Sequence, residues 1–349
     1  MKRVYRLIVW FFLVFQCTTL ALTDQAYGER ASGTKNVPFF SYLTDAKRPP
    51  VLIDYSPSDF DPRHGENFHL PSPLSIEKDL LALRSVFDGL VVYSYHPRVT
   101  PIILEKAKSL GFRAVILGIW GARSTREIQG VITLVHQYAD EMALAICLGN
   151  EGLYFHRYTM DDLVLAKNFL QMQLGPDLSV PITTSEPMSQ YRDVALYRFG
   201  DFLAPNIHPV WEKPALPPKD AVFWTRNQAI GLMEKAHKPV LVKETGFPQA
   251  GERHFTPQSQ KKFWDMYLKE KRLVYSQVDS QVWVSFATSF EAFSLPWKAE
   301  QSGQPVESAW GLMNKERVPY PAFYTWSNLQ SSFHMSREDF TQRVETKRE

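Results

Sequence analysis

Short apolar runs alternate with helical patterns along most of this chain, and this alternation is the feature that most constrains its fold. Each apolar run is short enough for a buried strand, and a segment with apolar residues at helical spacing usually follows it. The expected strands cover residues 51–55, 90–93, 113–119, 142–148, 180–186, 202–208, 240–243 and 282–286. This order predicts an α/β fold, a (β/α)8 TIM barrel. A doubly wound open sheet is the alternative, and it is disfavoured because no glycine-rich phosphate loop follows the first strand.

The predicted barrel fills one domain, residues 49–330, with additions at both ends of the 349-residue chain. Residues 1–21 have the pattern of a signal peptide, because Lys2, Arg3 and Arg6 precede the apolar run 7–15. Residues 22–48 are expected to form an N-terminal arm or linker, and residues 331–349 a charged C-terminal tail. We therefore expect a secreted or periplasmic protein, with an uncleaved membrane anchor as the alternative.

Composition excludes some functions and allows others. The net charge is +2 and the two signs alternate along the chain, so nucleic-acid binding is not expected. Aromatic residues make up 13% of the chain, which suits a large core, a cleft in which sugars stack, or both. Cys147 is the one cysteine outside the signal segment, so the mature chain has no internal disulfide, and its apolar strand predicts a buried thiol. We expect a monomer.

Two glutamates follow predicted strands at their carboxyl ends. Glu151 comes after the fourth strand in the sequence Gly149-Asn150-Glu151, and Glu244 comes after the seventh. Carboxyl ends of barrel strands form the active face, and the fourth and seventh strands lie on opposite sides of its mouth. Two carboxyl groups about 5–5.5 Å apart are what a retaining glycosidase needs, one to protonate the leaving oxygen and one to attack the anomeric carbon. The pattern therefore predicts a glycosidase site.

Other side chains near the predicted mouth are candidates for substrate binding. Asn150 is placed to donate to a sugar hydroxyl, although an ordinary turn asparagine is the alternative. Sugar binding or simple packing are both open for the remaining candidates, which are Tyr55, Tyr93, His208, Trp211, Trp297 and Trp310. The histidines show no metal-ligand spacing, so we expect no metal site.

Five motifs together resemble glycoside hydrolase family 17, in particular its bacterial and fungal β-1,3-glucanases and glucanosyltransferases. They are Leu148-Gly149-Asn150-Glu151, Thr184-Ser185-Glu186-Pro187, Asn206-Ile207-His208-Pro209, Glu244-Thr245-Gly246-Phe247-Pro248, and Trp310-Gly311-Leu312 followed by Pro321. The resemblance extends from about Asp54 to Phe323. The Gly-Asn-Glu motif and the Glu-Thr-Gly-aromatic-Pro motif, in this order, are its most specific part.

The resemblance implies a clan A barrel that retains anomeric configuration through a covalent glycosyl-enzyme. It implies Glu151 as general acid/base, Glu244 as nucleophile, a β-1,3-linked glucan polysaccharide or oligosaccharide as substrate, and no metal or organic cofactor. It also makes Glu186 and Phe247 candidate substrate-binding residues.

The chain departs from this family after the eighth strand. Members often have Phe-Asp-Glu-Pro-Trp-Lys there, where this chain has Phe293-Ser294-Leu295-Pro296-Trp297-Lys298. Both acids are missing, Trp297 and Lys298 remain, and Glu291 just upstream is a candidate replacement. Two alternatives therefore stay open beside hydrolysis. One is transglycosylation of β-1,3-glucan by the same residues, and the other is a glycan-binding barrel without turnover.

Overall fold

The computed structural model describes residues 36–64, 70–214, 216–269, 273–276 and 282–329. The predicted signal peptide and charged tail lie outside these residues. Within them, no helix is both long and apolar enough to cross a membrane.

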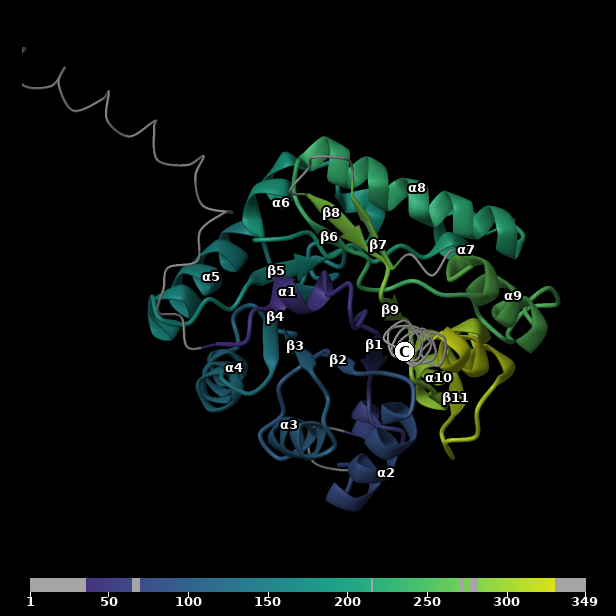
Figure 1. Ribbon diagram of the computed structural model, residues 1–349, viewed down its shortest axis with the longest axis horizontal. Coiled ribbons are helices and arrows are strands. Elements are labelled where there is room, and N and C mark those ends of the chain that lie inside the picture. Colours follow the sequence, from purple (N-terminus) through teal and green to yellow (C-terminus); the bar gives the residue numbers. More distant parts are fainter. Residues whose placement is uncertain (1–35, 65–69, 215, 270–272, 277–281, 330–349) are drawn as a thin grey trace, which may run out of the picture. The chain divides into compact units, whose positions relative to one another are not determined.

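A parallel sheet forms one side of the barrel (Figure 1). Its strands follow the order β5-β4-β3-β2-β1-β9, so strands that are consecutive in the sequence are neighbours in space. Their bounds are β1 Leu52–Tyr55, β2 Gly89–Val92, β3 Ala114–Ile119, β4 Ala143–Asn150, β5 Ile182–Ser185 and β9 Thr288–Ser289. Every residue of β1 to β5 is buried, as expected for parallel strands that are covered on both faces.

Shorter pairings complete the ring. Isolated parallel bridges join Pro187 to Asn206 and Leu203 to Val240, so residues 203–206 lie between β5 and β6. Strand β6 (Val240–Leu241) pairs with β8 (Trp283–Ser285), which leads within two residues to β9 beside β1. The predicted α/β barrel is therefore confirmed. Its sixth strand is reduced to bridges, and β7 (Val274–Ser276) is an unpredicted antiparallel neighbour of β8.

Helices pack against the outside of the barrel and against one another (Figure 1). They are α2 Pro73–Arg84, α3 Thr100–Ser109, α4 Thr125–Tyr138, α5 Met160–Leu174, α6 Val194–Phe199, α7 Pro209–Glu212, α8 Pro218–Ala236, α9 Pro257–Tyr267, α10 Pro296–Ser302 and a helix over 321–329. The side chains that cap α2, α4, α5 and α9 each accept a backbone N–H; they are Ser72, Ser124, Thr159 and Thr256. A small parallel pair, β10 (Phe293–Ser294) with β11 (Met313–Asn314), ties the last loop together.

The described part of the expected N-terminal arm is firmly packed. Helix α1 (Phe39–Leu43) buries Phe39 against Phe202 with 5.9 Å between ring centroids, and Tyr42 donates a 2.9 Å hydrogen bond to Asp88. Phe40 contacts Trp283 from the other side of the barrel. The sequence did not predict this role, because Phe39, Phe40 and Tyr42 show no regular spacing that would indicate a helix. Residues 37–43 of the arm therefore pack on the core, whereas Thr44 and residues 46–48 are exposed.

Candidate active site

The polypeptide turns sharply where β4 ends. Gly149 has φ +85°, and a Cβ there would lie 2.2 Å from the hydroxyl of Tyr158, so only glycine fits. Glu151 itself has φ +55°, an unusual conformation for a non-glycine residue, and its N–H donates to Ser185 at 2.7 Å. A register shift between β4 and β5 accompanies this turn. Together these features bring Glu151 out of the strand toward Asn206.

Amide groups surround the carboxyl of Glu151. The side-chain amide of Asn206 donates to Glu151 at 2.9 Å and to the side-chain oxygen of Asn150 at 3.1 Å. Ser185 donates in turn to the oxygen of Asn206 at 2.7 Å, which fixes the amide orientation. Burial raises the pKa of Glu151, and the nearby charge of Glu244 raises it further. Glu151 is therefore suited to carry a proton.

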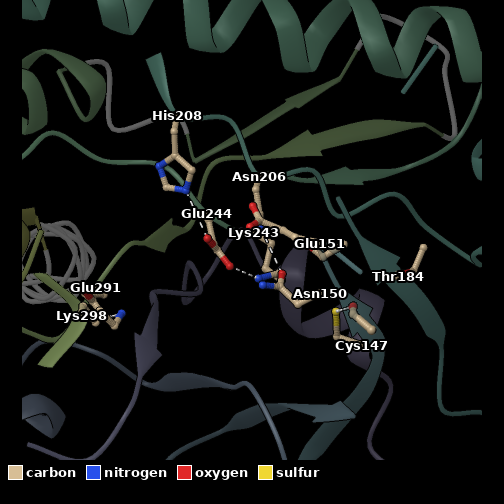
Figure 2. A network of polar contacts seen from close by, with 12 residues as sticks. Cys147, Asn150, Glu151, Thr184, Asn206, His208, Lys243, Glu244, Glu291 and Lys298 are labelled. Atoms are coloured by element: carbon tan, nitrogen blue, oxygen red, sulfur yellow. Dashed lines mark hydrogen bonds and ion pairs between the residues drawn. The ribbon is translucent and has the colours of Figure 1, made fainter. Parts of the chain in front are cut away.

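Lys243 and His208 contact the carboxyl of Glu244. One oxygen contacts the ammonium of Lys243, and the other lies 3.2 Å from Nε2 of His208 (Figure 2). Burial alone would raise the pKa of Glu244, but Lys243 and His208 outweigh it and lower the pKa to about 2. Glu244 is therefore a carboxylate at any ordinary pH, ready to act as a nucleophile.

The backbone brings the two glutamates together through residue 206. Asn206 forms a parallel bridge with Glu244, and the N–H of Ile207 donates to the carbonyl of Glu244 at 2.8 Å. The side chain of the same asparagine holds Glu151 (Figure 2). The irregular sixth strand thus links the two halves of the site, a role that the sequence did not reveal.

A second buried group of side chains lies beside Glu244 and was not expected from the sequence. Lys243 is 1% exposed, and its ammonium lies 4.8 Å from the ring centroid of Tyr93. Asp54 is fully buried, and neither of its carboxyl oxygens has a hydrogen-bond partner among the described residues. Burial raises the pKa of Asp54 far above its usual range, which favours its neutral form. Only the alternation of side chains along a strand hinted that Asp54 points inward.

Three predicted substrate-binding residues are instead inside the protein, which corrects the expectation that they line the mouth. Tyr55 donates to Asp79 at 3.0 Å, and Phe247 packs against Phe255 and Phe263. Glu186 is fully buried and accepts hydrogen bonds from N–H groups of the loop after Glu151. The sequence showed that these residues follow strands, but it did not show which way their side chains turn.

Glu186 supports the loop that follows Glu151. Its carboxylate accepts the N–H groups of Leu153 at 2.9 Å and Tyr154 at 3.1 Å, and the hydroxyl of Tyr158 lies 3.3 Å away. Burial raises the pKa of Glu186, and these hydrogen bonds oppose that effect. Its position indicates a structural role, in which it holds the unusual backbone at Glu151.

Glu291 and Lys298 form a buried ion pair at 2.5 Å (Figure 2). Burial raises the pKa of Glu291, and Lys298 opposes this effect. Glu291 also lies close enough to Glu244 for their charges to interact. The carboxyl of Glu291 is 1% exposed and paired with Lys298, so its role as a replacement for the missing acids or in substrate binding stays a prediction.

Aromatic side chains flank the glutamates on both sides. Trp211 is exposed and lies 6.3 Å from the buried ring of Trp310, which itself contacts His208 at 5.0 Å. Trp297 is partly buried beside Lys298. On the side of Glu151, the sequence analysis missed three exposed aromatic residues, which are Trp120, Tyr154 and Phe155. They follow strand ends just as the predicted residues do, and that position was the signal that pointed to them.

No group of three or more histidine, cysteine, aspartate or glutamate side chains in the described part of the chain is arranged to hold a metal ion. The thiol of Cys147 is buried, and burial raises its pKa to about 12. It is therefore unreactive, as its strand position predicted.

A model of the BtgE/BtgC glycoside hydrolase domain matches residues 53–311, well over half of the chain. The chain belongs to the BtgE/BtgC glycoside hydrolase domain family. The matched range begins in β1 and ends just before β11, so this glycoside hydrolase domain includes every element that carries Glu151 and Glu244. No curated protein sequence matches it significantly.

Solved structures of other glycosidases share the fold at low identity. A family 17 β-1,3-glucanosyltransferase from Rhizomucor miehei is 19% identical, with TM-score 0.59 over 78% of this chain and 96% of that one. An endo-laminarinase from Formosa is 17% identical, with TM-score 0.62 over 80% and 86%. A β-1,3-glucanase from Cryptomeria japonica pollen is 14% identical, with TM-score 0.57 over 78% and 97%. These likenesses show that this glycoside hydrolase domain has the barrel of the clan A glycosidases.

Proposed function

We propose that this domain is a retaining hydrolase of β-1,3-linked glucan, with Glu151 as general acid/base and Glu244 as nucleophile. The observation that carries the proposal is the contrast between the two carboxyl groups, since Glu244 is held by Lys243 and His208 while Glu151 is held by an amide. Such a contrast lets one carboxyl stay ionised while its neighbour stays protonated, as a double-displacement glycosidase requires.

The reaction would proceed in two steps. In the first, the Glu244 carboxylate attacks the anomeric carbon, the glycosidic carbon–oxygen bond breaks, and the proton of Glu151 passes to the leaving oxygen. In the second, Glu151 takes a proton from water, the water oxygen bonds to the anomeric carbon, and the Glu244 carboxylate leaves. Each carboxyl group ends in its starting state, and the configuration at the anomeric carbon is retained.

Similar structures support β-1,3-glucan as the substrate class. The three similar structures are named as a glucanosyltransferase, a laminarinase and a glucanase, all linked to β-1,3-glucan or laminarin. An active-site mutant of the Rhizomucor miehei enzyme is described in complex with laminaritriose. In this chain, the predicted polar candidates that lie next to the glutamates are Asn150, Tyr93 and His208.

Transglycosylation is the second candidate, and the exposed aromatic residues on both sides of the glutamates favour it. Trp211 lies on one side and Trp120 on the other, so a second glucan chain has apolar ring faces on which to stack. An acceptor sugar that occupies the place of water would then receive the glycosyl group from Glu244.

We also propose that residues 1–21 direct the protein out of the cytoplasm, so that it meets extracellular or periplasmic glucan.

Product analysis with laminari-oligosaccharides tests the proposal. The wild type is expected to give shorter products if it hydrolyses and also longer products if it transfers, with retained configuration by NMR. Glu244→Ala must abolish both kinds of product. Calorimetric binding without turnover by the wild type would overturn the enzyme proposal in favour of a glycan-binding barrel. If the wild type neither binds nor turns over these oligosaccharides, the substrate assignment is overturned.

A further inference from the structure

Lys243 is an unusual neighbour for a nucleophile. It is 1% exposed, it precedes Glu244 directly in the sequence, and its ammonium contacts the Glu244 carboxylate (Figure 2). Neighbouring residues in a regular strand point to opposite faces, so this contact depends on β6 ending at Leu241. The backbone is therefore shaped so that both side chains reach the same place inside the barrel.

An ammonium group in a protein interior is costly unless it is paired. Burial by itself would lower the pKa of Lys243, but the effects that raise it, of which the charge of Glu244 is the largest, prevail, so the side chain keeps its charge. The ring of Tyr93, 4.8 Å from the ammonium, adds a favourable cation–π contact. A methionine or leucine would fill the same volume without this desolvation cost, which indicates that the charge itself has a role.

We propose that Lys243 is a positioning residue for glycoside cleavage, which holds the Glu244 carboxylate in one orientation and neutralises its charge inside the barrel. The inference rests on the proposed role of Glu244 as nucleophile. His208 lies 3.2 Å from the second oxygen of the same carboxylate, so the two contacts together define its plane. Lys243 is buried behind the carboxylate, so it acts on the reaction only through Glu244.

Among the charges around Lys243 and Glu244, that of Lys243 contributes most to keeping Glu244 ionised. Asp54 adds a further buried carboxyl from β1, and the Glu291–Lys298 pair is already neutral as a whole. The groups that face Lys243 or Glu244 from the surrounding elements are Asp54, Tyr93, Cys147, Glu151, His208, Glu291 and Glu307. Burial of Glu244 and the nearby carboxyl groups disfavour its negative charge, so removal of Lys243 should push Glu244 toward its protonated form.

The pH dependence of kcat/KM for laminari-oligosaccharides tests this role, with wild type, Lys243→Met and Lys243→Arg compared. Methionine keeps the volume and removes the charge. The midpoint of the acid limb should rise by about one to three pH units, as expected when an opposite charge is removed from a carboxylate. Activity lost at acidic pH should return as the pH rises toward neutrality. Arginine keeps the charge and should leave the acid limb close to that of the wild type, even if kcat falls.

A matched control lies just before the same strand. Lys238 precedes the opposite end of β6 and donates to the carbonyl of Gly200 at 2.7 Å, so Lys238→Met removes a partly buried lysine away from the glutamates. It should leave both limbs of the pH profile unchanged. A uniform loss of activity across all pH values in Lys243→Met, or an unchanged profile, would overturn the inference while the proposed function stands. A wild type without turnover would overturn both.

Discussion

The two carboxyl groups of this glycoside hydrolase domain lie in surroundings of different charge. Glu151, at the end of β4, is held by the neutral amide of Asn206, whereas Glu244, after β6, contacts Lys243 and His208. Both side chains are largely buried, so burial raises the pKa of each. At Glu244 the contacts with Lys243 and His208 overcome this effect. Two chemically identical residues thus acquire opposite proton affinities from their neighbours alone.

Removal of Glu244 should have the largest effect, because no other carboxylate is placed to form the covalent intermediate. Glu244→Gly should lose activity by on the order of 10⁴-fold or more. Azide, which fits the space of the missing carboxylate, should restore turnover of an activated aryl β-glucoside and give the α-glucosyl azide. NMR of the product checks the configuration. A β-glucosyl azide from this variant would mean that the roles of the two glutamates are reversed.

Removal of Glu151 should have a smaller effect that depends on the leaving group. Glu151→Ala should lose about 10² to 10⁴-fold in kcat/KM on laminari-oligosaccharides, the usual contribution of a general acid. A dinitrophenyl glycoside needs no proton to leave, so its first step should be almost unaffected. Burst kinetics measure that step directly. Equal losses on both substrates would contradict the acid role.

Substitution of the two glutamates should affect the stability of the protein differently. Glu244→Gln leaves Lys243 with a weaker partner and should cost about 3 kcal/mol at neutral pH, because a broken buried pair is strongly destabilising. The folded protein depresses the pKa of Glu244 to about 2. The ionised carboxylate therefore contributes to the stability of the folded state at pH values above the pKa that Glu244 has in the unfolded chain, and this contribution is lost as the pH falls through 2. The difference in Tm between wild type and variant should therefore shrink as the pH falls from about 4 toward 2.

Glu151→Gln serves as the matched variant for this comparison. The pKa of Glu151 is raised in the folded state, so its ionised form destabilises the protein at neutral pH. The amide substitution should leave Tm unchanged or raise it. A large loss of stability in Glu151→Gln would contradict the difference between the two sites.

Asn206 should produce the smallest effect, since it acts on Glu151 through one hydrogen bond. This bond lowers the pKa of Glu151, so Asn206→Ala should raise that pKa and move the alkaline limb of kcat/KM upward by about one pH unit. The acid limb, which depends on Glu244, should stay in place. A shift of the acid limb instead would mean that Asn206 acts mainly on the nucleophile through their shared backbone bridge.

The sequence by itself determined the fold class and the two central glutamates. The alternation of apolar runs with helical periods is a local property of the sequence. The position of a glutamate directly after an apolar run is local too, so both features could be predicted from neighbouring residues. The positions of Glu151 after β4 and Glu244 after β6 follow that prediction closely.

Tertiary structure alone decided which neighbouring side chains turn toward those glutamates. Tyr55 and Phe247 follow strands as Tyr93 does, yet they are buried in packing, while Lys243 and Asp54 reach the interior beside Glu244. The link through Asn206 depends on a strand of isolated bridges that no periodicity marks. The physical reason is that pKa values and side-chain directions depend on charges and contacts from residues far apart in the sequence, which meet only when the barrel closes.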